Sequence, residues 1–219
     1  MKVILFGATG MVGQGVLREC LLSPQVEKVL SVGRSATGLK EAKLKELVRA
    51  DLYDYSGVQA ELRDYDACFF CLGVSSAGMR EADYRRITYD LTLAAAAVLA
   101  PLNPGMTFIY VSGQGSDSTE MGRSMWARVK GATENALLRL PFKAAYMFRP
   151  GLIRPLHGIR SRTPLYNAFY VALTPLLALL SRLFPNQVTS TERVGRAMIR
   201  AALYGAPKAL LETRDINAL

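Results

Sequence analysis

The chain has 219 residues, of which half are hydrophobic and 21% are charged, and its formal net charge is +9. This composition is typical of a globular protein, and we expect a single domain, 1–219, long enough to bury a full core. Nucleic acid is not the expected partner, because the arginines are scattered and no nucleic-acid-binding module accompanies them. Small anionic ligands explain the positive charge more simply.

The cysteines and the first residues bear on cellular location and on metals. The three cysteines lie in apolar segments, as expected of reduced, buried thiols. The first apolar run is too short for a signal peptide and ends in a glycine turn. We therefore expect a cytoplasmic protein. We expect no metal, because the single histidine and the cysteines lack the spacing of metal ligands.

A glycine-rich turn follows the first expected strand, Lys2 to Phe6. Gly7, Gly10 and Gly13 have the spacing G-x-x-G-x-x-G, and a pattern of helical period follows them. This context is that of the dinucleotide-binding fingerprint, in which glycines allow a tight turn, close approach to a pyrophosphate and close helix packing. The N–H groups at the start of the helix would bind the phosphates. We expect cofactor contacts at Gly7, Thr9, Gly10, Met11, Val12 and Gly13.

The end of the second expected strand, Val29 to Val32, favours NADP(H) over NAD(H). Enzymes that use NAD usually carry an acidic residue about 20 residues after the glycines, where it bonds the ribose 2′-hydroxyl. None lies between Lys28 and Lys40, and Arg34 follows the strand directly. A guanidinium would attract a 2′-phosphate that a carboxylate would repel. The alternative is a solvated arginine in a loop.

Further apolar runs alternate with segments of helical pattern, which predicts an α/β fold: a Rossmann-like, doubly wound, mostly parallel sheet with helices on both faces. The later strands are expected at 44–50, 67–71, 107–111 and 144–148, with a short one at 209–212. Helices are expected from near Tyr55, from a cap at Asp83 to about Leu99, over 123–139, and from a Thr189–Glu192 capping box to near Gly205. A turn is expected at 101–105.

Two strand ends add expected cofactor contacts. Asp51 and Leu52 follow the third strand, and Asp51 would accept a hydrogen bond from the adenine amino group or would instead cap the next helix. Cys71, Leu72 and Gly73 follow the fourth strand, where the glycine would let the backbone pass close to a ligand.

These motifs resemble the short-chain dehydrogenase/reductase superfamily in its atypical branch, and within it the TIP30-like and bacterial NAD(P)-dependent epimerase group. The likeness covers roughly residues 1–155 and is carried by the glycine turn, 33–34, 72–73, 110–112, 129–134 and 149–151. It implies an NADP(H)-binding oxidoreductase or epimerase for a small carbonyl or sugar-like substrate. It also implies that Lys130 bonds the nicotinamide ribose and that the carboxamide end passes Pro150, Gly151, Leu152 and Ile153.

In that superfamily a Ser, a Tyr and a Lys act together, and the resemblance places Ser112 and Lys130 at two of these catalytic positions. The Tyr stands four residues before the Lys, on the same helical face, where this chain has Trp126. A phenol can donate a proton in general acid catalysis, whereas an indole N–H is only a hydrogen-bond donor. Trp126 would stack on or wall off the nicotinamide, or would be a bulky core residue. Glu134 is placed for a helical ion pair with Lys130. Other phenols that could replace the missing one are Tyr84, Tyr89 and Tyr166.

The C-terminal segment, 152–219, is expected to lie on the substrate side of the domain. Arg154 and Arg160, in a basic loop, would bind an anionic substrate or the cofactor phosphates; the alternative is a solvated loop. Residues 163–181 carry no charge, and two Thr-Pro pairs favour two short helices over one membrane span. We expect this stretch to form a lid over the substrate pocket or a homodimer contact through 163–183, with core or membrane surface as alternatives.

The sequence therefore predicts an NADP(H)-binding protein and leaves its activity open. Ser112 and Lys130 favour an oxidoreductase or epimerase in which Trp126 replaces the catalytic Tyr. Trp126 itself favours the alternative, a non-catalytic NADPH sensor that regulates a protein partner through its apolar C-terminal helices. A fold alone does not establish a reaction.

Overall fold

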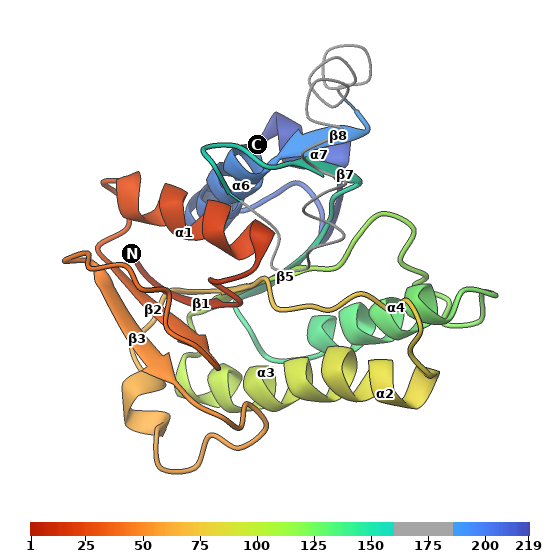
Figure 1. Ribbon diagram of the computed structural model, residues 1–219, viewed down its shortest axis with the longest axis horizontal. Coiled ribbons are helices and arrows are strands. Elements are labelled where there is room, and N and C mark those ends of the chain that lie inside the picture. Colours follow the sequence, from red (N-terminus) through yellow and green to blue (C-terminus); the bar gives the residue numbers. More distant parts are fainter. Residues whose placement is uncertain (160–185) are drawn as a thin grey trace.

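The computed structural model describes residues 1–159 and 186–219, in which parallel strands alternate with helices (Figure 1). The main sheet has seven strands in the order β3-β2-β1-β4-β5-β6-β9. They are β1 Lys2–Phe6, β2 Lys28–Gly33, β3 Leu44–Val48, β4 Ala67–Phe70, β5 Thr107–Val111, β6 Ala144–Arg149 and β9 Leu210–Glu212. The expected doubly wound α/β fold is confirmed. The strand order reverses between β1 and β4, which is where such sheets bind their ligands.

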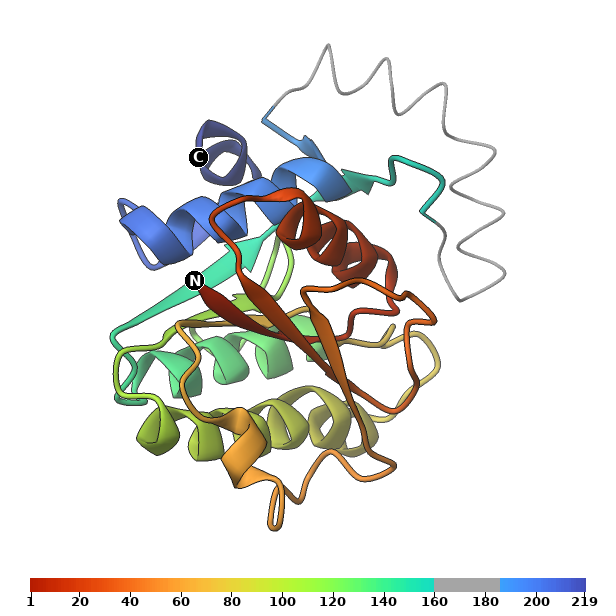
Figure 2. The ribbon, with the colours of Figure 1, turned by 90° about the vertical axis from the view of Figure 1, so that its left-hand side faces the viewer.

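Helices cover both faces of this sheet. On one face lie α1, Met11–Leu22, and α6, Thr191–Tyr204; on the other lie α3, Leu91–Leu102, and α4, Met125–Leu138 (Figures 1 and 2). The helix α2, Glu81–Arg85, continues through a π-helical turn, Arg86–Asp90, into α3. The remaining elements are a 3₁₀ turn at Gln59–Leu62, the helix α7 at Thr213–Ala218, and a separate parallel pair of strands, β7 Leu152–Arg154 and β8 Val188–Ser190.

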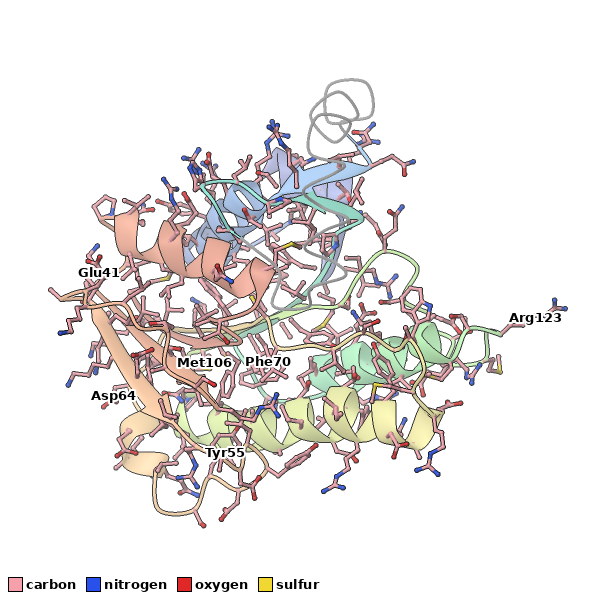
Figure 3. All side chains as sticks on the ribbon, in the orientation of Figure 1. Glu41, Tyr55, Asp64, Phe70, Met106 and Arg123 are labelled. Carbon is pink, nitrogen blue, oxygen red and sulfur yellow. The ribbon has the colours of Figure 1, made fainter. Side chains whose placement is uncertain are left out.

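The core is divided by the sheet into two layers. Val3 and Leu5 of β1 pack with residues of α1 and α6, whereas Ile4 and Phe6 pack with residues of α3. All four side chains have no exposed surface, because a parallel strand with helices on both faces is buried on both sides. Figure 3 shows Phe70 on the α3 side of the sheet, where its ring stacks on that of Phe6 with centroids 4.9 Å apart.

Most expected strands are confirmed, but some helix boundaries were wrong. No helix begins near Tyr55; the chain there leads only into the 3₁₀ turn at Gln59–Leu62. Asp83 does not cap its helix, because the helix already begins at Glu81, and its carboxylate pairs instead with Arg80, Nε to Oδ2 2.8 Å. The cap of α6 is Ser190, whose hydroxyl accepts a hydrogen bond from the Arg193 N–H.

Pro101 lies inside the last turn of α3, where a turn of the chain had been expected. The short strand expected at 209–212 is confirmed as β9 and pairs with β6 at the edge of the sheet. Within the described ranges, no helix is both long enough and apolar enough to cross a membrane.

Candidate functional site

Two adjoining cavities lie at the carboxyl ends of the parallel strands. The larger, here called the β5 cavity, has a volume of about 1050 Å³ and is lined by residues that follow β1, β4, β5 and β6. The smaller, the β2 cavity, has a volume of about 700 Å³ and is lined by residues that follow β1, β2, β3 and β4. Residues that line both are Gly10, Met11, Cys71, Leu72, Gly73 and Val74. The two cavities therefore form one elongated site across the point where the strand order reverses.

The glycine turn lies where the two cavities adjoin: Gly10 lines both of them, and Gly7 lines the β2 cavity. Gly7 has a φ of +79°, and a Cβ there would lie 2.7 Å from the Leu72 backbone nitrogen. A Cβ on Gly13 would lie only 2.0 Å from the carbonyl oxygen of Gly7, so α1 can pack on the turn only if residue 13 has no side chain. The helix begins after Gly10 with no side-chain cap and no acidic residue in its first turn. Its N-terminal N–H groups and positive dipole end are thus left for an anion.

The β2 cavity contains the residues expected to contact the adenosine half of a dinucleotide. Arg34 follows β2 directly, is exposed, and lines this cavity. Leu52 is buried in its wall. Asp51 also lines it, but its carboxylate accepts a hydrogen bond from the Tyr53 N–H at 2.7 Å. The Tyr53 hydroxyl in turn donates to the carbonyl of Arg86 at 3.1 Å, so the loop after β3 is tied to the helix on the far side of the cavity.

Ser112 and Lys130 meet in the β5 cavity. The Ser112 hydroxyl is buried and donates a hydrogen bond to the Phe148 carbonyl at 3.1 Å. The Lys130 amine on α4 donates a short hydrogen bond to the carbonyl oxygen of Ser112. Burial lowers the pKa of Lys130 to about 8, and the nearby carboxylate of Glu134 opposes this shift. A lysine with a pKa so close to neutrality loses its proton far more readily than an exposed one.

The ion pair expected between Lys130 and Glu134 does not form. Glu134 is fully buried and binds Arg149 of β6 instead, with Arg149 Nε 3.0 Å from Oε1 and a second, shorter contact from Nη2. Arg149 also donates to the Ser118 hydroxyl at 2.6 Å. The structure thus places Arg149 in the packing between sheet and helix. No carboxylate of the described chain lines the β5 cavity.

Trp126 lies in the wall of the β5 cavity rather than in the core. It is the second residue of α4, one turn before Lys130, and its ring packs against Gly115, where a Cβ would lie 3.3 Å from Cη2. Neither Tyr84 nor Tyr89 lines this cavity. Tyr84 is buried, and burial raises the pKa of its hydroxyl. Among residues 1–159 and 186–219, no phenol is available to the β5 cavity.

Only some of the other residues that were expected at the site line the β5 cavity. Pro150, Gly151, Leu152 and Ile153 all line the β5 cavity, next to Ser112. Arg154 does not line either cavity; it lies on β7, opposite Ser190 of β8. Arg160, Tyr166 and the expected lid or dimer segment 163–183 lie outside the described residues.

Several residues that line the β5 cavity were not identified from the sequence, among them Gln114, Gln187 and Val188. Gln114 follows Ser112 in a glycine-rich loop, and its amide oxygen reaches 2.4 Å from the place where a Cβ on Gly151 would lie. Gln187 and Val188 come from the start of β8, and no motif marks them. A polar residue between two glycines was the only available signal for Gln114. In the described part of the chain, no group of acidic, cysteine and histidine side chains could hold a metal ion.

No protein-family model matches this chain. It is similar to fungal proteins that are named FMP52 and mitochondrial. The one from Meyerozyma guilliermondii is 25% identical over 210 residues, which are 93% of this chain and 86% of the relative. The one from Emericella nidulans is 30% identical over 159 residues, which are 69% of this chain and 66% of the relative, just under two thirds of its length.

Several solved structures share the fold at low identity. The enzyme WbmF from Bordetella bronchiseptica, in complex with NAD+, has a TM-score of 0.68 and 17% identity, covering 99% of this chain and 76% of its own. A UDP-N-acetylglucosamine 4-epimerase from Methanobrevibacter ruminantium has a TM-score of 0.69 and 14% identity, covering 95% and 74%. A short chain dehydrogenase family protein from Francisella tularensis has a TM-score of 0.63 and 15% identity, covering 93% and 91%.

These comparisons confirm one expectation and contradict another. The resemblance to the short-chain dehydrogenase/reductase superfamily is confirmed at the level of the fold. The expected cytoplasmic location was wrong, because the similar fungal proteins are named as mitochondrial. Reduced cysteines do not distinguish the cytoplasm from other reducing compartments.

Proposed function

We propose that this protein binds a nicotinamide dinucleotide, NADP(H) in preference to NAD(H), across the two cavities. In this proposal it is an oxidoreductase or epimerase for a small carbonyl or sugar-like compound held in the β5 cavity. When bound, the nicotinamide supplies or accepts a hydride. The observation that carries the proposal is the cradle made by Gly7 and Gly13, whose backbone approach leaves no room for a Cβ at either position.

The fit between the site and a dinucleotide is supported at both ends. At one end, Arg34 lies at the rim of the β2 cavity, and the strand before it ends without an acidic residue. A 2′-phosphate there would meet a guanidinium rather than a carboxylate, which supports the preference for NADP(H). At the other end, Pro150 to Ile153 would border the nicotinamide, and the amine of Lys130 would bond the ribose. WbmF, which shares the fold and is in complex with NAD+, also supports a dinucleotide as the ligand.

The chain's own residues limit the chemistry. Ser112 would orient a substrate carbonyl, but its hydroxyl proton is committed to Phe148, so it must rotate before it can donate to the substrate. Trp126 stands where a catalytic phenol is expected, and its indole N–H does not ionise in the working pH range. General acid–base catalysis is worth about 10²–10⁴-fold in rate, so we expect turnover to be slower by a factor of that order than with a tyrosine.

The indole of Trp126 also favours a second candidate function, in which the protein binds NADPH without turnover and regulates a protein partner. An indole in the cavity wall can cover the nicotinamide and exclude a substrate while still permitting the cofactor to bind. In this second proposal, partner binding changes with NADPH occupancy, and replacing Trp126 creates activity rather than removing it.

Calorimetric titration with NADPH and NADH tests cofactor binding and preference. We expect NADPH to bind more tightly than NADH, and the Arg34→Glu variant to lose about 10–100-fold in NADPH affinity while its NADH affinity changes little. Arg123→Glu is the matched control, because Arg123 points away from the body of the molecule (Figure 3). Equal affinities for both cofactors would refute the preference, and no binding of either would refute the proposal.

Turnover of the wild type and of Trp126→Tyr separates the two candidate functions. NADPH consumption would be followed with a panel of small aldehydes and ketones, and conversion to the epimer with a panel of nucleoside-diphosphate sugars, because an epimerase consumes no NADPH overall. Activity in the wild type supports the enzyme. Activity that appears only with the introduced phenol supports the sensor.

A further inference from the structure

The β5 cavity contains an amine that has no acidic partner. Lys130 is in the cavity wall, and its Nζ lies 3.6 Å from the place where a Cβ on Gly113 would lie. The amine donates a hydrogen bond to the backbone carbonyl of Ser112. Glu134, the nearest carboxylate on the same helix, is held by Arg149. A lysine in a cavity without a counter-ion loses its proton more readily than one in water, because the charged form is poorly solvated there.

The other groups around the amine do not cancel this lowering of the lysine pKa. Cys71, at the end of β4, lines the same cavity, and burial raises the pKa of its thiol, so it stays uncharged near neutral pH. From α4, Glu134 favours the ammonium form, but burial outweighs it and the pKa of Lys130 falls to about 8. From β6, Arg149 cancels most of the Glu134 charge. At pH 7.5 about a quarter of Lys130 is then neutral, against about one in a thousand for an ordinary lysine.

The rest of the cavity suits an uncharged ligand with an apolar body. Apolar surface in this cavity comes from Val74, Trp126, Leu152 and Val188. Of the described residues that line it, Lys130 is the only one with a cationic side chain. The other polar side chains that line it are uncharged: the amides of Gln114 and Gln187, the hydroxyl of Ser112, the thiol of Cys71 and the indole of Trp126. An aldehyde or ketone fits this combination of apolar walls and a single amine.

We propose that Lys130 is a nucleophilic amine that forms a reversible imine with an uncharged aldehyde or ketone bound in the β5 cavity. One amine proton is donated to the Ser112 carbonyl, which leaves the nitrogen lone pair directed elsewhere. The nitrogen lone pair forms a bond to the carbonyl carbon, the carbon–oxygen π electrons move to oxygen, and one proton passes from nitrogen to that oxygen to give a carbinolamine. The carbon–oxygen bond then breaks and water leaves, taking the remaining nitrogen proton as its second hydrogen, which gives the neutral imine without consuming an oxidant or a reductant.

This activity does not require the proposed cofactor, and the two proposals make different predictions about NADPH. If the nicotinamide ribose bonds Lys130, then NADPH must compete with the carbonyl compound for the amine. The imine would in that case form in the cofactor-free protein.

Reductive trapping tests the proposal. The full chain would be incubated with benzaldehyde and sodium cyanoborohydride at pH 7.5, and the sites of benzylation would be located by peptide mass spectrometry over time. We expect Lys130 to be modified roughly 250-fold faster than exposed Lys143 in the same sample, which is the ratio of the neutral fractions given above for Lys130 and an ordinary lysine. The rate at Lys130 should rise with pH and level off above about pH 8.

Variants and NADPH provide the controls. Lys130→Arg keeps a positive charge but has no nucleophilic amine, and should abolish the fast phase; Lys143→Arg should leave it unchanged. Equal rates at Lys130 and Lys143 in the wild type would overturn the proposal, whatever the cofactor result. Fast labelling that NADPH suppresses supports the imine and the cofactor placement together. Fast labelling that NADPH does not affect supports the imine and counts against the placement of the ribose at Lys130.

Discussion

The guanidinium of Arg149 on β6 binds the carboxylate of Glu134 on α4, and this pairing leaves Lys130, one turn earlier on the same helix, without an acid to neutralise it. Glu134 has no exposed surface and Arg149 little, so the pair lies in the packing between sheet and helix. A buried carboxylate is tolerated there because it receives several hydrogen bonds from the same guanidinium. The stability of the α4–β6 contact and the chemistry of the cavity are therefore coupled through one side chain.

We expect Glu134→Gln to destabilise the protein by about 3 kcal/mol, because it leaves Arg149 buried with an incomplete set of partners. Urea unfolding would measure this loss. Asp83→Asn is the matched control, since it breaks a solvent-exposed pair with Arg80 that should contribute little to stability. Losses of similar size in the two variants would show that the Arg149 pair is not a major source of stability.

Gly13→Ala should impair the glycine turn. The added methyl group would lie 2.0 Å from the carbonyl oxygen of Gly7, so α1 would have to move away from the turn. We expect a loss of about 1–3 kcal/mol in stability, as for other overpacked sites, together with loss of NADPH binding by calorimetry. Gly105→Ala, where a Cβ meets nothing within 4 Å, should change neither property. Unaltered NADPH affinity in Gly13→Ala would place the cofactor elsewhere.

Trp126 makes cofactor binding visible without a label. It is the single tryptophan of the chain and lines the β5 cavity, so its emission reports on that cavity alone. We expect NADPH to quench the emission in a saturable way, with the same dissociation constant as calorimetry gives. Trp126→Phe should bind NADPH with an affinity within a few-fold of the wild type but show no signal. Calorimetric binding with unchanged emission would mean that the nicotinamide does not reach the indole.

The lowered pKa of Lys130 makes the stability of the protein depend on pH, and this dependence can be separated from that caused by other titrating groups. Below about pH 8 the amine is protonated in the folded and unfolded states, and the cost of burying its charge is complete. Between about pH 8 and pH 10 the folded protein releases this proton while the unfolded chain keeps it, so this contribution to stability rises with pH. The pKa of Cys20, raised by burial, acts in the opposite direction over part of this range, because the unfolded thiol ionises first.

The difference in unfolding free energy between the wild type and Lys130→Met isolates the contribution of the lysine. We expect the variant to be more stable than the wild type by about 1–3 kcal/mol near pH 7, and this advantage to shrink as the pH approaches 10. Chemical denaturation at a series of pH values would measure it. A difference that stays constant with pH would show that the amine is well solvated in the folded protein.

The main sheet and the glycine turn were predictable because they depend on local patterns. Apolar runs such as Val3 to Phe6 are buried on both faces of a parallel sheet, and Gly7 and Gly13 mark the turn by their spacing. The strands β7 and β8 have three residues each and lack alternation, so no period could reveal them. The π-helical turn at Arg86–Asp90 departs from helical period without a proline or glycine to mark it.

The sequence indicated individual residues of the candidate site, but not which of them contact one another. Ser112, Lys130 and Trp126 were singled out by motif and all line the β5 cavity. The partner of Glu134 could not be predicted from the sequence. Lys130 is its neighbour along the helix, whereas Arg149 contacts Glu134 only because β6 packs on α4. Gln187 reaches the cavity for a similar reason: β8 pairs with β7, far away in the sequence.

The last strand of the sheet, β9, pairs with β6, and α6 lies beside α1 over the same face. During synthesis, residues 1–159 would therefore leave the ribosome with one apolar face of the sheet only half covered and with the edge of β6 unpaired. Both gaps close only after residues 191–212 have been made. Until these C-terminal elements are made, the exposed apolar surface and the unpaired strand edge make the nascent chain prone to aggregation.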